Sequence, residues 1–128
     1  MAPTPATVGN HLLASLPRTD RQRIVASCEP VDLPMGEVLV ERGERIRHVY
    51  FPTDSFVSLT TAADNGTTLE VGLVGHEGML GTSLILGVDV APLRALVQGE
   101  GMALRMKTAP FRRELGQSPA LARSMKRY

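Results

Sequence analysis

The residues best suited to chemistry are Gly81, Thr82 and Ser83, followed after a short apolar segment by Arg94. Glycines recur through residues 72–81, and backbone without Cβ atoms can approach a ligand closely. Successive N–H groups and two hydroxyls at a helix start suit an anion, and an arginine can add a charge-assisted pair. One interpretation of these residues is a pocket for a small ligand, with or without a phosphate. The alternative is a β-barrel corner with glycines at bends, where Thr82 and Ser83 only cap a short helix, Leu84–Gly87.

Other reactive residue types form no catalytic or metal-binding constellation. The three histidines are scattered, and the residue four after His76 is Leu80, so the sequence His76-Glu77 does not continue as a zinc-protease motif. Cys28 is the only cysteine, which excludes an internal disulfide and any cysteine-rich metal cluster, and it lies on the apolar side of an expected helix. We expect no catalytic residues, no metal and no enzyme activity.

Length and charge bound the class of protein. The chain has 128 residues, a length typical of one domain, and a net charge of +1. The charge is uneven: residues 29–100 have 11 acidic and 4 basic side chains, whereas residues 101–128 have 7 basic and 1 acidic. A basic end suits nucleic acid or the solvated face of a helix. No apolar run approaches membrane-spanning length, so we expect no membrane partner. Residues 1–8 do not resemble a secretory signal, so we expect a disordered tail there and a cytoplasmic protein.

The elements that must position these residues are mostly short strands. Turn signals separate them, and the strongest is Asn65-Gly66, which predicts a type I′ hairpin turn with positive φ at both residues. Two short helices are expected first, Gly9–Leu16 capped by Asn10 and a second from Thr19 or Asp20 to Cys28. The expected strands are Val31–Leu33, Glu37–Val40, His48–Phe51, Phe56–Thr61, Thr68–Val74, Leu93–Gln98 and Met102–Met106.

Helical spacing returns after residue 107. Phe111 and Leu115 lie four residues apart, and we expect Gly116 to end that helix. Ser118-Pro119 then predicts a cap followed by proline at the first helical position. Leu121, Met125 and Tyr128 continue at helical spacing. The pattern predicts a mainly β fold, a jelly-roll (double-stranded β-helix) barrel of about eight strands with short flanking helices at both ends.

Several motifs follow one another in an order typical of one family. They are Asn10-His-Leu-Leu-Ala-Ser-Leu-Pro17, Gly36-Glu-Val-Leu-Val-Glu-Arg-Gly-Glu44 with Ile46, His48-Val-Tyr-Phe-Pro52, Asn65-Gly66, Glu70-Val-Gly-Leu-Val-Gly75 and Glu77-Gly-Met-Leu-Gly81. This order resembles the N-terminal sensor domain of the Crp/Fnr family of bacterial transcription regulators, a cyclic-nucleotide-binding-like jelly roll. The resemblance covers residues 9–128: the jelly roll with its N-terminal helices over 9–107, and over 108–128 the C-terminal helices that begin a truncated dimerisation helix.

The resemblance also implies a ligand site. Members that bind cyclic AMP or cyclic GMP resemble Gly-Glu-Leu/Ile-Ala at the helix start, where Glu holds the ribose, and Arg-Ser/Thr-Ala on the return strand, where Arg holds the phosphate. Here Gly81 matches, but Thr82 stands at the Glu position. If the strand is anchored on Ala95, the Arg position is Leu93 and Arg94 falls on the serine, whose side chain points to the other face. We therefore expect a degenerate phosphate cassette that disfavours cyclic nucleotides.

Two functions stay open at this point. The first is the effector-sensing domain of a Crp/Fnr-like regulator, with an unknown small-molecule effector bound at Gly81, Thr82, Ser83, Arg94 and Ala95. In the full-length form the resemblance implies a homodimer that meets DNA only through a C-terminal domain absent from this chain. The second is a ligand-free structural or protein-interaction and dimerisation jelly roll, its pocket filled by side chains such as Met79 and Leu84. An open cavity lined by residues 81–83 favours the first, and a packed one favours the second.

Overall fold

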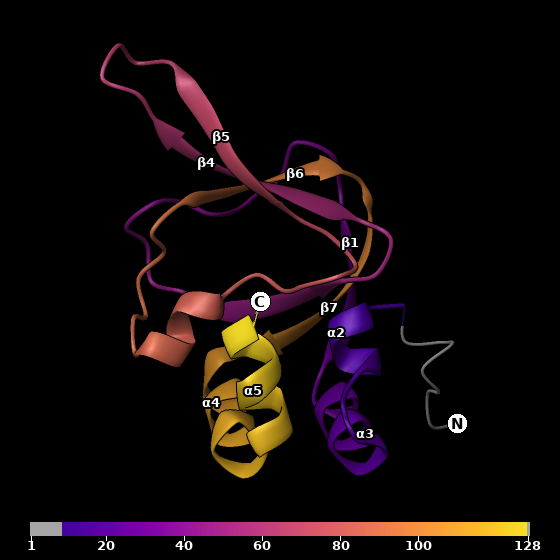
Figure 1. Cartoon of the computed structure of the whole chain (residues 1–128). Coiled ribbons are helices and arrows are strands. Elements are labelled where there is room, and N and C mark those ends of the chain that lie inside the picture. Colours follow the sequence, from indigo (N-terminus) through magenta and orange to yellow (C-terminus); the bar gives the residue numbers. More distant parts are fainter. Residues whose placement is uncertain (1–8, 128) are drawn as a thin grey trace.

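A computed structural model describes residues 9–127, with side chains to Met125. The tail expected at residues 1–8 and the helical position expected for Tyr128 lie outside the described residues. Within the described part, seven strands form two antiparallel sheets, and the helices that precede and follow the strands in the chain lie together on one side of them (Figure 1). The predicted jelly roll with flanking helices is confirmed.

The two sheets have the crossed strand order of a jelly roll. One sheet has the order β1-β7-β3, and the other has the order β2-β6-β4-β5. Neighbouring strands are antiparallel throughout, and strands far apart in sequence, such as β1 and β7, pair closely. The strands are β1 Glu29–Leu33, β2 Val38–Val40, β3 His48–Pro52, β4 Phe56–Ala62, β5 Thr68–Val74, β6 Arg94–Gly99 and β7 Gly101–Lys107.

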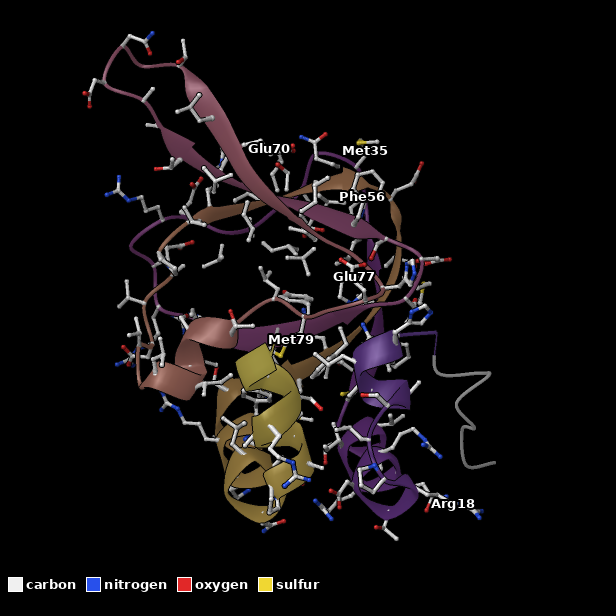
Figure 2. The ribbon with its side chains drawn as sticks, viewed as in Figure 1. Arg18, Met35, Phe56, Glu70, Glu77 and Met79 are labelled. Carbon is white, nitrogen blue, oxygen red and sulfur yellow. The ribbon has the colours of Figure 1, made fainter. Side chains whose placement is uncertain are left out.

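Alternation along β3 divides the core into two layers. Val49 and Phe51 are fully buried against the helices, whereas Tyr50 between them faces the space between the two sheets. The inter-sheet layer also contains Val57 of β4 and Val97 of β6. The helical layer is the larger of the two, and Met79 lies in it between the strands and the C-terminal helix (Figure 2).

The N-terminal helices are α2, His11–Ala14, and α3, Arg18–Ala26. Asn10 caps α2 as predicted, since its side chain accepts a hydrogen bond from the Leu13 N–H at 3.1 Å. The predicted cap of α3 at Thr19 or Asp20 is wrong: the helix begins at Arg18, after the extended residue Pro17, and no side chain caps it. Asp20 lies inside the first turn instead, where its carboxylate accepts a hydrogen bond from Ser118.

The C-terminal helices are α4, Thr108–Gln117, and α5, Pro119–Arg127. Gly116 does not end α4, which continues one residue further because Gly116 meets no neighbour and adopts ordinary helical φ. The predicted cap at Ser118 is confirmed, since its Oγ accepts from the Leu121 N–H at 3.1 Å. Both helices lie beside α2 and α3 under the three-stranded sheet (Figure 1). No helix of the described residues is long and apolar enough to cross a membrane.

The β4–β5 hairpin projects away from the rest of the fold (Figure 1). Its turn is not type I′, because among residues 9–127 only glycines have positive φ. Asp64 and Asn65 occupy a turn closed by the Gly66 N–H and Ala63 carbonyl at 2.9 Å, and Gly66 alone is left-handed. Asn65 instead accepts hydrogen bonds from the backbone and hydroxyl of Thr67.

Candidate ligand-binding site

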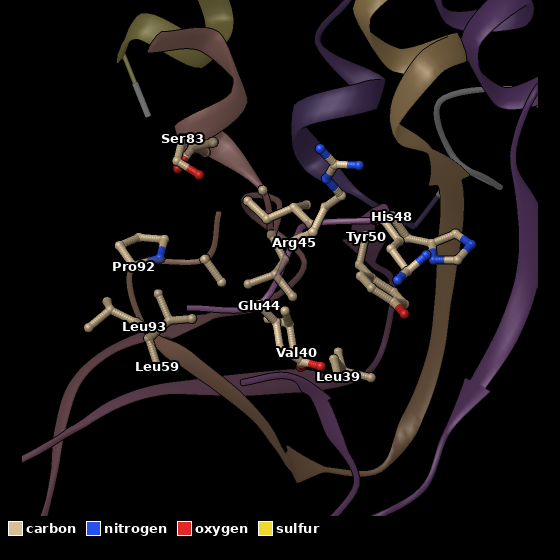
Figure 3. A pocket seen from close by; sticks show the side chains of 16 residues that line it. Leu39, Val40, Glu44, Arg45, His48, Tyr50, Leu59, Ser83, Pro92 and Leu93 are labelled. Carbon is tan, nitrogen blue, oxygen red and sulfur yellow. The ribbon is translucent and has the colours of Figure 1, made fainter. Parts of the chain in front are cut away.

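A cavity of about 230 Å³ lies between the ends of the two sheets (Figure 3). Gly81, Thr82 and Ser83 line it on one side, so the structure brings these three predicted residues together around an open space. Strands β2, β3 and β4, the β2–β3 loop residues 44–47 and residues 91–93 just before β6 supply the other walls. The lining is mainly apolar: Leu39, Val40, Ile46, Leu59, Leu80, Ala91, Pro92 and Leu93.

The predicted helix start at Gly81 is a single 3-10 segment, η1, Thr82–Leu86. It begins two residues before the expected Leu84, because Gly81 turns the chain with φ of 114° and thereby places Thr82 and Ser83 inside the segment. Thr82 and Ser83 are therefore part of η1 and do not cap it. A Cβ at position 81 would lie 2.7 Å from Val49 Cγ1, so both conformation and space require glycine there.

Arg94 and Ala95 are not among the residues that line the cavity. Ala95 is fully buried in the inter-sheet core, and alternation along β6 therefore directs Arg94 to the opposite face of the sheet. There the Arg94 Nε lies 3.3 Å from Glu41 Oε1 in an ion pair without hydrogen-bond geometry, and the arginine side chain is 40% exposed. Leu93, two residues before Ala95, lines the cavity. If the strand is anchored on Ala95, the sequence places Leu93 at the position of the phosphate-binding arginine. The structure has this register, because Leu93 lines the cavity and Arg94 does not.

The basic side chains beside the cavity come from a different segment. Arg45, Arg47 and His48 line it, from the end of the β2–β3 loop into β3 (Figure 3). Backbone hydrogen bonds between residues 43–46 and residues 89–91 fix this loop, for example from the Ile46 N–H to the Asp89 carbonyl at 2.8 Å. Burial lowers the pKa of His48, and the positive charges of Arg105, Lys107 and Arg47 lower it further against an opposing effect of Glu29.

Sequence reasoning did not find the wall formed by residues 44–48. The signal available was two arginines on either side of Ile46, directly after the turn at Gly43-Glu44. Such a pattern is also typical of a solvated loop, and only the pairing with residues 89–91 brings it beside Gly81. The apolar residues of β2 and β4 at the cavity are equally ordinary strand residues in the sequence.

Metal-binding geometry is not found in the described part of the chain. Among residues 9–127, no three His, Cys, Asp or Glu side chains come close enough together to hold an ion. The Cys28 thiol is half-buried, and burial raises its pKa to about 12, so it is protonated at neutral pH.

The fold and cavity match a known family. Residues 30–118 match the family described as "Cyclic nucleotide-binding domain", which is more than half of the chain. The chain therefore belongs to the cyclic nucleotide-binding domain family, whose members are regulatory domains. No curated protein has a sequence that matches the chain.

Solved structures of similar fold include three bacterial regulators. The N-terminal domain of a transcriptional regulator from Streptomyces coelicolor A3(2) is 21% identical with a TM-score of 0.71, over 91% of this chain and 81% of that one. The sensor domain of the transcriptional regulator DNR from Pseudomonas aeruginosa is 17% identical with a TM-score of 0.72, over 91% and 78%. The Thermus thermophilus Catabolite Activator Protein is 15% identical with a TM-score of 0.76, over 90% and 54%. The fold of a regulator's sensor domain, predicted from the motif order, is confirmed.

Proposed function

We propose that this chain is the effector-sensing domain of a Crp/Fnr-like transcription regulator and that its effector binds in the cavity beside Gly81. The observation that supports this most directly is the open space of about 230 Å³ lined by Gly81, Thr82 and Ser83. An apolar cavity of about 150 Å³ is enough to hold benzene. The mainly apolar lining favours a small effector with a compact apolar body.

The phosphate cassette is degenerate in this proposal. Thr82 replaces the carboxylate that would hold a ribose, and Leu93 stands where an arginine would meet the phosphate. Arg94 lies outside the cavity beside Glu41, and Ala95 packs behind its wall. The walls formed by residues 80–83 and 91–93 carry no basic side chain. A phosphate held there would be buried without a charge partner, which is costly, so cyclic AMP and cyclic GMP bind weakly or not at all. Gly81, Thr82 and Ser83 are the residues we propose to contact the effector.

Binding would act on the C-terminal helices. Segment η1 contacts α5, and Leu84 of η1 packs in the same core as Leu121 and Met125 of α5. An effector that favours one arrangement of η1 would therefore favour one packing of α5. In the intact regulator we propose a homodimer whose DNA contacts belong to a further, C-terminal domain.

Restoring the missing groups tests the cassette. The variant Thr82→Glu/Leu93→Arg supplies both, and Thr82→Gln/Leu93→Met is its uncharged control. Isothermal titration with cyclic AMP should give no binding for the wild type and the control at millimolar ligand. Two charge-assisted contacts of about 1.5–3 kcal/mol each predict a gain of about a hundredfold or more for the charged variant. Micromolar binding by the wild type, or no gain in the charged variant, would overturn the proposal that the cassette is degenerate.

The second candidate is a ligand-free scaffold, and the observation in its support is that the cavity is smaller than most ligand pockets. Pockets for drug-sized ligands usually enclose about 300–1,000 Å³, more than the 230 Å³ found here. A scaffold would bind no small molecule at residues 81–83. Titration with a compact probe such as indole separates the two candidates, because indole is small enough for the cavity.

A further inference from the structure

A second, shallower hollow of about 660 Å³ lies on the outer surface, where the β2–β3 loop meets the junction of β7 and α4. Five basic side chains line it: Arg45 and Arg47 from the loop, and Lys107, Arg112 and Arg113 from the junction and α4. We call this hollow the basic groove. It shares residues 45–48 with the effector cavity, but Lys107, Arg112 and Arg113 belong to the groove alone.

The positive charge of the basic groove is largely uncompensated. Asp89 is the one acidic residue in its lining, and its carboxylate lies 3.7 Å from the Arg45 guanidinium. Among the side chains that the structure describes, the other four basic residues have no carboxylate within 4.0 Å. His48 is the remaining titratable group, and burial and the neighbouring positive charges lower its pKa, which favours the neutral imidazole. The lining therefore carries five positive charges against one negative charge.

The two walls of the basic groove are held in fixed positions. The β7 strand passes into α4 without a loop, and Thr108 at this junction binds the opposite wall twice. Its N–H donates to the Arg47 carbonyl at 3.1 Å, and its hydroxyl donates to the Ile46 carbonyl at 2.9 Å. The N-terminus of α4, the positive end of the helix dipole, also faces the groove, because Thr108 and Ala109 line it. No side chain caps this N-terminus. The backbone segments that carry the basic side chains of both walls are thus held around one space.

Several uncompensated cations in one hollow repel one another, and a multiply charged anion relieves this repulsion. Guanidinium groups match phosphate oxygens in bidentate geometry. The concave shape suits a compact ligand, whereas a nucleic acid duplex needs an extended surface that follows its backbone. We propose that the basic groove binds a small polyphosphate anion, that is, a molecule with two or more linked phosphates, at a site separate from the effector cavity.

Inorganic tripolyphosphate is the probe for this site, by isothermal titration of the whole chain at low ionic strength. Arg112→Ala/Arg113→Ala removes two exposed cations of the groove, and Arg18→Ala/Arg42→Ala removes two exposed arginines elsewhere with the same change in net charge. Loss of two charge-assisted contacts should weaken binding by about tenfold or more in the first variant. The control should stay within about threefold of the wild type, because its two arginines lie outside the groove lining and act only through screened attraction.

Four results would overturn the proposal. Equal losses in the two variants would mean diffuse attraction to net charge, and no binding by the wild type would mean that the hollow is a solvated surface. Equal affinities for monophosphate and tripolyphosphate would exclude a site for linked phosphates. Tighter, Arg112- and Arg113-dependent binding of a short DNA duplex would assign the groove to nucleic acid. If the double alanine variant fails to fold by circular dichroism, Arg112→Gln/Arg113→Gln replaces it, since glutamine keeps the length and the helix propensity.

Discussion

The buried side chain of Asn10 should be among the most sensitive positions in the fold. It is fully buried and makes three hydrogen bonds. Its Nδ2 donates to the carbonyls of Pro52 and Gly78, each at 2.8 Å, and its Oδ1 accepts from the Leu13 N–H at 3.1 Å. One side chain thus joins the first helix to the end of β3 and to the segment that leads to Gly81.

The magnitude of Asn10→Ala follows from these three contacts. Loss of the helix cap costs about 1 kcal/mol. Each carbonyl left buried without its donor costs about 1 kcal/mol at the low end of the measured range. The variant should therefore lose about 3 kcal/mol in free energy of unfolding. With a urea dependence of about 2 kcal/mol per molar, the unfolding midpoint should fall by about 1.5 M.

The matched control is Asn65→Ala, because the Asn65 side chain also makes hydrogen bonds, two that it accepts, but lies exposed in the β4–β5 turn. Water replaces its contacts, so a loss below about 1 kcal/mol is expected. Asn10→Asp keeps the acceptor for Leu13 but turns a carboxylate toward two carbonyl oxygens, and it should destabilise at least as much as alanine. If the urea midpoints of Asn10→Ala and Asn65→Ala agree within error, the reasoning is refuted.

Three further predictions concern the cassette and two titratable groups. Gly81→Ala should lower the free energy of unfolding, measured in urea, by roughly 1–3 kcal/mol, because Gly81 has a φ of 114° and a Cβ there would meet Val49. Gly43→Ala is the control and should cost less, since a Cβ at position 43 meets open space. Equal losses in the two variants would contradict this. The Cys28 thiol, with its pKa raised to about 12, should react with a disulfide reagent at pH 8 more than about a hundredfold slower in the native protein than in urea; similar rates would contradict burial. The lowered pKa of His48 means that the unfolded state binds more protons below about pH 6.5. Stability should therefore fall as the pH drops through that value toward the folded pKa, and His48→Asn should reduce this slope in urea titrations at pH 5 to 7; an unchanged slope would contradict the assignment.

The strands could be predicted because their side-chain alternation and turn residues are local signals. The β5 strand shows both the strength and the limit of such signals. Alternation of Leu69, Val71 and Leu73 correctly indicates a strand, yet all three are about half exposed. A bulge opposite Leu59 and Thr60 shifts the register of β5 against β4. The β4–β5 hairpin also projects past the three-stranded sheet, so no second layer covers its end (Figure 1). Burial depends on these long-range positions, which the sequence pattern of one strand does not contain.

The candidate site was predictable only in part for the same reason. Residues 81–83 carry a local signal, a glycine turn followed by hydroxyl side chains, and they do line the cavity. The choice between Leu93 and Arg94 depends on the register of β6 against β2 and β4. The arginines at positions 45 and 47 reach the cavity because their loop pairs with residues 89–91, a contact between segments more than 40 residues apart.

The most direct test of the central claim, that the cavity beside Gly81 binds a small molecule, is an amide chemical-shift titration of the ¹⁵N-labelled chain with indole. The effector-sensing account predicts saturable shifts centred on Gly81, Thr82, Ser83 and Leu93. These shifts should be lost in Leu59→Phe, which fills the cavity, and kept in Leu69→Phe, which makes the same change on an exposed strand position. Shifts that are absent, scattered over the surface or unchanged by Leu59→Phe would contradict the account and leave the ligand-free scaffold in its place.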